Sequence, residues 1–103
     1  MRKIIVAVAP VALGPQEGVK SPFTPEEVAE EVVACARIGA SVVHLHVRDR
    51  EGRLTDDLTE FSRTLELITE GTDIIIQGST GGVSELTVEQ RCVALREPRV
   101  ETA

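Results

Sequence analysis

Aromatic side chains are nearly absent from this sequence. Among its 103 residues there are two Phe and no Trp or Tyr. The core must therefore be built from aliphatic side chains. With 42% hydrophobic and 27% charged residues, the composition is that of a globular protein rather than a disordered one. A chain of this length has room for one modest core.

An excess of positive charge, a long apolar run and a cysteine framework are also missing. Eleven basic and seventeen acidic residues give a formal net charge of -6, which disfavours nucleic-acid binding but not a small anionic substrate. No apolar run approaches the length of a membrane span, so no membrane partner is expected. Cys35 and Cys92 lie far apart on predicted helices. This favours reduced thiols in a cytoplasmic protein over a disulfide.

Strand-like and helix-like segments alternate along the chain. Runs of β-branched residues predict the strands, and apolar residues at helical spacing predict the helices. The first strand, a continuous apolar run, is expected to be buried on both faces. The predicted strands are 3–9, 41–47 and 73–77, with the start of a fourth at 99–103; the predicted helices follow Thr24, span about 57–70, and run from Thr87 to Pro98.

Capping signals fix the helix ends. Thr24 with Glu27, and Thr87 with Gln90, have the spacing of a capping box. Glycines after the apolar repeats predict the ends of the first two helices. The expected buried stripes are Val28, Val32 and Cys35 or Ala36; then Leu58, Phe61, Leu65 and Ile68; then Val88, Cys92 and Leu95.

Alternating strands and helices imply an α/β fold with parallel strands and right-handed crossovers. A doubly wound open sheet and part of an eight-fold barrel both fit. A complete barrel needs about 250 residues. On the barrel interpretation, residues 1–103 are the N-terminal part of a single TIM-barrel domain, truncated after three βα units and the start of a fourth strand.

His44 and His46 are the only histidines in the chain. Side chains alternate across a strand, so both should share one face with Arg48, near the strand's C-terminal end. Active sites of α/β folds form at that end. The pair fits two ligands of a catalytic zinc ion, which needs a third protein ligand. The alternative is two polar residues hydrogen-bonded to their neighbours.

Two further segments could contact a substrate. The glycine-rich stretch 78–82 contains Ser79 and Thr80, and could bind a carboxylate or a phosphate through its N–H and hydroxyl groups. An ordinary βα connection explains it as well. Arg48 and Asp49 are candidates for a substrate clamp and its orienting partner, with a salt bridge at the strand end as the simpler interpretation.

Taken together, these segments resemble the β-keto acid cleavage enzymes. The matching stretches are IVAVAP at 5–10, TPEE at 24–27, GA at 39–40, VHLHVRD at 43–49 and IIQGSTGG at 75–82. Arg91 and residues 98–102 resemble the family's approach to its fourth strand. The similarity spans nearly the whole chain, and its order and spacing make it more specific than any single motif.

The resemblance implies a TIM barrel that binds Zn2+ through His44, His46 and a Glu beyond residue 103. It implies exchange of a β-keto acid with acetyl-CoA, giving acetoacetate and a new CoA thioester. Ser79, Gly82 and, less securely, Thr102 match substrate contacts, to which Thr80 is added as a neighbour. The catalytic base is expected downstream, so this fragment should be inactive alone. The full-length protein is expected to be a homo-oligomer.

One position departs from the family pattern. Leu13 or Gly14 lies near the place of a Glu that receives the ammonium of an amine-bearing substrate, so such a substrate is not expected. Two rival functions stay open. One is another metal-dependent TIM-barrel lyase or aldolase with the same His pair. The other is a non-catalytic domain whose glycine-rich loop binds a small anion.

Overall fold

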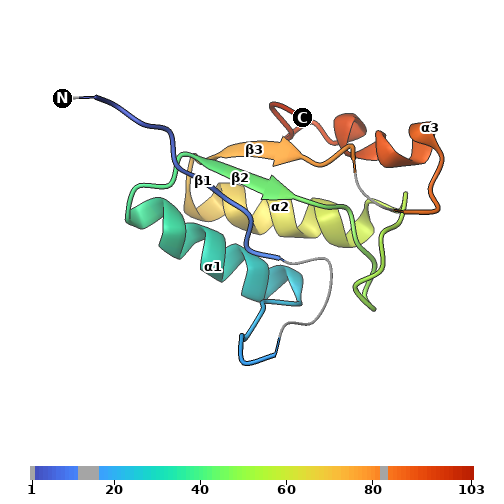
Figure 1. Ribbon diagram of the computed structural model, residues 1–103, viewed down its shortest axis with the longest axis horizontal. Coiled ribbons are helices and arrows are strands. Elements are labelled where there is room, and N and C mark those ends of the chain that lie inside the picture. The colour runs from blue at the N-terminus through green and yellow to red at the C-terminus, as the bar shows by residue number, and fades with distance from the viewer. Residues whose placement is uncertain (1, 12–16, 82–83) are drawn as a thin grey trace.

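The computed structural model describes residues 2–11, 17–81 and 84–103. It is a small α/β unit in which helices pack on a parallel sheet (Figure 1). The strands are β1 (Ala7–Val8), β2 (Val42–Leu45) and β3 (Ile75–Gly78); the helices are α1 (Pro25–Arg37), α2 (Thr59–Gly71), α3 (Val88–Arg91) and the 3₁₀ helix η1 (Val93–Arg96).

The sheet has its strands in chain order, β1-β2-β3, and all are parallel, as the strand–helix alternation predicts. A parallel bridge also pairs Gln77 with Thr102. The Gly78 amide donates to the carbonyl of Thr102 over 2.9 Å, and the Glu101 amide donates to that of Ile76 over 2.9 Å. Residues 99–103, predicted as the start of a fourth strand, therefore form one isolated bridge beside β3 and not a strand of the described sheet.

Helices α1 and α2 pack against each other on one side of the sheet (Figure 1). The core between them and the sheet is aliphatic apart from Phe61, which is also buried. Its largest fully buried side chains are Val32, Val43, Leu65, Ile68 and Ile76. The other side of the sheet, here called the open face, carries Val42, His44, Ile75 and Gln77, all at least partly exposed.

Both predicted capping boxes are present. The Glu27 amide donates to Oγ1 of Thr24 over 3.2 Å, and the Thr24 amide donates to a Glu27 carboxylate oxygen over 3.4 Å. Thr87 and Gln90 make the same reciprocal pair at the start of α3. After α1, Gly39 has a φ of +115°, a backbone conformation that side chains with a Cβ rarely adopt.

The first strand is shorter than predicted. Only Ala7–Val8 pair with β2, and Ile5 is 80% exposed, so burial of this run on both faces is wrong for this chain. The reason lies in its partners. The hydrogen bonds between this run and the second strand segment begin at Val6, whose carbonyl accepts from the Ser41 amide. On its other edge, β1 pairs with no described strand.

The second helix begins two residues later than predicted, at Thr59. The Asp57 carboxylate accepts hydrogen bonds from both the amide and the hydroxyl of Thr59. Asp57 therefore lies outside the helix and bonds to its first residue. Gly71 is the last residue of α2 rather than the position after it.

The predicted buried stripe of the third helix is wrong. Val88 is 62% exposed and Leu95 is 55% exposed, whereas Val93 and Ala94 are buried. Helix α3 has four residues and then tightens into the 3₁₀ helix η1. A 3₁₀ helix turns with fewer residues than an α-helix, so the buried face shifts away from the α-helical stripe.

The described chain has no helix long and apolar enough to cross a membrane. Cys35 and Cys92 are both free, as expected, but each is half-buried and not fully buried.

Candidate functional site

The site begins with the alternation of side chains along β2 and just beyond it. Val43, Leu45 and Val47 are buried against the helices, while His44 and His46 are half-buried on the open face. The centroids of the two imidazole rings lie 5.2 Å apart, with an angle of 87° between the ring planes. The prediction that both rings share one face of the sheet is confirmed.

The neighbouring strand holds one of these rings. His44 pairs with Gln77 in the parallel register of β2 and β3, and its Nδ1 atom lies 2.8 Å from Oε1 of Gln77. An amide oxygen only accepts, so Nδ1 is the donor in this contact, and in the neutral form of the ring Nε2 would then hold the lone pair. Gln77 was not among the predicted site residues. Its signal is indirect: it lies on the same face as His44 only once the two strands are known to be neighbours.

The surroundings of the second ring favour its neutral form. Burial lowers the pKa of His46, and the nearby His44 and Arg48 lower it further. A neutral imidazole is the form that binds a metal. The two rings therefore have the donor type, the tautomer on His44 and the proximity that a zinc site requires.

A metal site would still need ligands from elsewhere. Within residues 2–11, 17–81 and 84–103, no cluster of three or more His, Cys, Asp or Glu side chains could hold a metal ion. A catalytic zinc ion usually takes three protein ligands and one open position. The pair fits two of those ligands.

The stretch after β3 lies beside the histidines. His46, Ser79 and Gly81 border a common cavity of about 20 Å³. The Ser79 amide donates to the Leu45 carbonyl over 2.8 Å, which ties the loop to β2. The Ser79 hydroxyl donates to the Gly81 carbonyl over 3.4 Å. The structure thus places Ser79 next to the candidate metal ligands.

The other predicted substrate contacts that the structure describes do not border the cavity that His46 and Ser79 share. Thr102 pairs with Gln77, so His44, Gln77 and Thr102 form one row across three neighbouring chain segments. Thr80 is half-buried directly after Ser79. Gly82 lies outside the described residues, as do Leu13 and Gly14.

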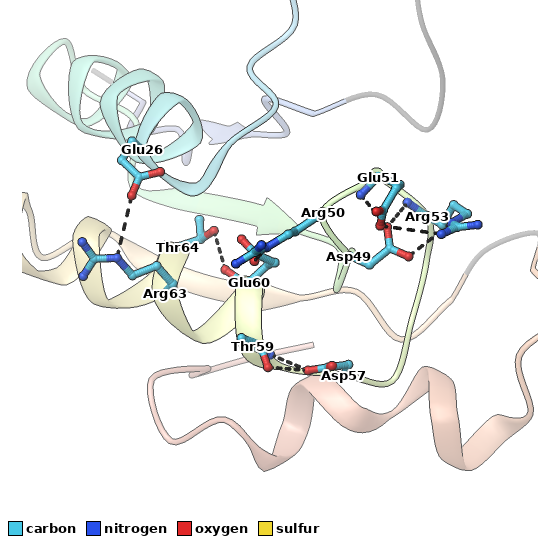
Figure 2. A network of polar contacts seen from close by, with 10 residues as sticks. All are labelled: Glu26, Asp49, Arg50, Glu51, Arg53, Asp57, Thr59, Glu60, Arg63 and Thr64. Carbon is cyan, nitrogen blue, oxygen red and sulfur yellow. Dashed lines mark hydrogen bonds and ion pairs between the residues drawn. The ribbon is translucent and has the colours of Figure 1, made fainter.

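Arg48 and Asp49 have different partners. The Asp49 carboxylate forms an ion pair with Arg53 at 3.3 Å and accepts hydrogen bonds from two loop amides, as Figure 2 shows. The backbone hydrogen bond from Arg53 is the main cause of the lowered pKa of Asp49. The Arg48 guanidinium lies 5.8 Å from the centre of the Phe23 ring. Asp49 therefore shapes the 49–53 turn.

His46 and Arg48 also border a larger cavity, of about 630 Å³. Its other walls come from the first turns of α1 and α2. Ion pairs cross this region, among them Arg50 with Glu60 at 2.9 Å and Arg63 with Glu26 at 3.9 Å (Figure 2). His46 therefore lies where a small cavity and a larger one meet.

The sequence matches the beta-keto acid cleavage enzyme family over residues 3–103. It is 37% identical to a 3-keto-5-aminohexanoate cleavage enzyme from Fusobacterium nucleatum, over 88% of this chain and 35% of that protein. The 3-keto-5-aminohexanoate cleavage enzyme from Acetoanaerobium sticklandii is 36% identical, over 88% of this chain and 34% of that protein.

A third relative is the 3,5-dioxohexanoate:acetyl-CoA acetone transferase of Paraburkholderia graminis, 34% identical over 87% of this chain and 30% of that protein. The chain thus spans about a third of the length of the curated relatives it matches. The family match covers almost every residue and includes both histidines and the glycine-rich loop. This chain belongs to the β-keto acid cleavage enzyme family.

Proposed function

We propose that the protein containing this chain is a zinc-dependent β-keto acid cleavage enzyme. It would exchange a β-keto acid with acetyl-CoA to give acetoacetate and a new CoA thioester. In this exchange the bond between the keto carbon and the methylene carbon breaks. The methylene carbon bonds instead to the acetyl carbon of acetyl-CoA, whose bond to the CoA sulfur breaks, and that sulfur bonds to the acyl group of the original keto acid. The names of the relatives support both the β-keto acid and acetyl-CoA as reactants.

The observation that carries the proposal is the paired, half-buried imidazoles of His44 and His46 on the open face. Gln77 orients the first ring, and burial lowers the pKa of the second ring, which favours its neutral form. A zinc ion bound there would polarise the keto group as a Lewis acid. The third zinc ligand, a Glu, and the catalytic base would come from outside this chain.

The acid end of the substrate would bind beside the histidines. Ser79 borders a cavity with His46, and Thr102 stands in one row with His44. Thr80 and Gly82, from the same glycine-rich loop, complete the proposed contacts. Hydroxyl and backbone donors at this place would hold the carboxylate while the keto group faces the metal.

The order of the strands supports a TIM barrel over a doubly wound sheet. In a doubly wound sheet the order of the strands reverses at a switch point, and helices cover both faces. Here three strands and the Thr102 segment follow one another in chain order, and α1 and α2 lie on the same side. In a barrel, the open face would become the interior. Residues 1–103 would then be the N-terminal part of a single barrel domain in a cytoplasmic homo-oligomer.

Replacing both histidines in the complete protein tests this function. The His44→Ala, His46→Ala double variant should lose bound zinc, which we expect at about one ion per subunit in the wild type. It should also lose acetoacetate formation from acetyl-CoA and a β-keto acid, because two of the three proposed protein ligands of the zinc ion are gone. Zinc content by metal analysis and acetoacetate by enzymatic assay are the measurements.

A matched control is Ser41→Ala, an exposed residue that directly precedes the same strand, which should keep both properties. Retained zinc and turnover in the double variant would contradict the proposal. Cleavage of the keto acid without acetyl-CoA, in a retro-aldol assay, would instead favour a lyase with the same His pair.

A further inference from the structure

Two buried polar atoms have no hydrogen-bond partner in the described part of the chain. They are the hydroxyl oxygen of Ser84 and the Nε atom of Arg91. Leaving a buried donor unpaired costs free energy, so such atoms are uncommon in folded proteins and point to a missing partner. Both residues border the small cavity that His46 and Ser79 also border.

The cavity limits what that partner can be. At about 20 Å³, it has room for about one water-sized group. None of the described residues that border it is acidic. The Arg91 guanidinium offers donors and no acceptor, and the Ser84 hydroxyl donates as well. A single acceptor atom would satisfy both groups, and the cation favours an acceptor with negative charge.

We propose that Ser84 and Arg91 together bind one carboxylate oxygen of the β-keto acid, an inference that rests on the proposed function. In such an acid one methylene group separates the carboxylate from the keto carbon. A carboxylate oxygen held in a cavity bordered by His46 therefore leaves the keto group close to the histidine pair. Arg91 and Ser84 would select substrates with a free acid end, a role that the family comparison does not assign to either residue.

Calorimetric titration of the complete protein with acetoacetate tests the pair without requiring turnover. In Ser84→Ala and in Arg91→Gln the Kd for acetoacetate should rise at least about tenfold, as expected for loss of a charge-assisted hydrogen bond. Arg96→Gln is the matched control, because Arg96 is an exposed arginine five residues further on that does not border the cavity. Its Kd should equal that of the wild type.

Thermal unfolding of the ligand-free protein separates binding from a structural role. Removing a hydroxyl that has no partner should leave the Tm of Ser84→Ala unchanged or raised. A lowered Tm would show that Ser84 bonds to a protein group or a trapped water, and would overturn the proposal. This variant decides the matter even if Arg91→Gln does not fold.

An equal Kd in wild type, Ser84→Ala and Arg91→Gln would also overturn it. So would failure of the wild type to bind acetoacetate, even in a preparation that contains zinc and turns over. Conversely, absence of zinc and turnover in a wild type that binds acetoacetate through these two residues would overturn the proposed function alone.

Discussion

At the scale of single residues, the ring of His44 is oriented by one hydrogen bond from the next strand. Its Nδ1 atom lies 2.8 Å from Oε1 of Gln77. Such a bond fixes the tautomer and the direction of a metal-binding imidazole, and raises its basicity. Gln77 would therefore contribute to zinc affinity without touching the ion.

Replacing Gln77 by Ala in the complete protein should weaken zinc binding by about 10–100-fold, the usual effect of losing a group that orients a ligand. A competition titration with a chelator measures the affinity. The matched variant Gln77→Glu keeps an acceptor oxygen in place, so its zinc affinity should stay near that of the wild type. Equal affinities for wild type and Gln77→Ala would show that His44 needs no such support.

At the scale of elements, a buried carboxylate joins η1 to α2. Glu97 is 5% exposed. Its two oxygens accept hydrogen bonds from the Ser62 hydroxyl at 2.6 Å and the Arg99 guanidinium at 2.8 Å. Burial by itself would raise the pKa of Glu97, but the hydrogen bonds from Ser62 and Arg99 outweigh it and leave the pKa lowered.

A lowered pKa in the folded state makes this contact dependent on pH. Its contribution to stability is present above the pKa of Glu97 in the unfolded chain and is lost as pH falls through the folded-state pKa. The Glu97→Gln variant should be less stable at neutral pH by about 1–3 kcal/mol, because it replaces a charge-assisted acceptor. The difference from wild type should shrink as pH falls below the ordinary pKa of a glutamate side chain, because the lowered pKa of Glu97 keeps its carboxylate charged down to that range.

Urea unfolding of the complete protein at several pH values measures this difference. Glu101→Gln, an exposed glutamate nearby, serves as the control and should show no such trend. A Glu97→Gln variant whose deficit stays constant with pH would show that the lost contribution does not depend on ionisation of the carboxyl group.

At the scale of the whole molecule, much apolar surface is left uncovered. Ile4, Ile5 and Ile75 are exposed, and no described strand covers the far edge of β1. Unpaired strand edges and apolar faces promote association. In a complete barrel, further strands and the interior side chains would cover both.

The 103-residue chain expressed alone should therefore be molten or aggregated and enzymatically inactive. Binding of a hydrophobic dye, a broad thermal transition by circular dichroism and large species by light scattering are the expected results. The complete protein is the control and should unfold in a sharp transition. A sharp, cooperative unfolding of the short chain as a monomer would favour the rival interpretation, a non-catalytic domain that binds a small anion.

Local rules in the sequence determined a large part of this structure. The capping boxes at Thr24 and Thr87 depend only on residues three positions apart, and both are present. The common face of His44 and His46 depends only on the period of a strand. The order of strands and helices likewise follows from short-range patterns, so the α/β class could be predicted.

The tertiary structure alone decided what depends on partners distant in sequence. Among the described strands β1 pairs with β2 alone, over Ala7–Val8, and η1 buries Val93 and Ala94 instead of the predicted stripe. The bond between His44 and Gln77, and the meeting of Ser84 and Arg91 beside His46, arise from strand register and loop packing. Each joins segments that the chain brings together only when it folds, so no local pattern encodes it.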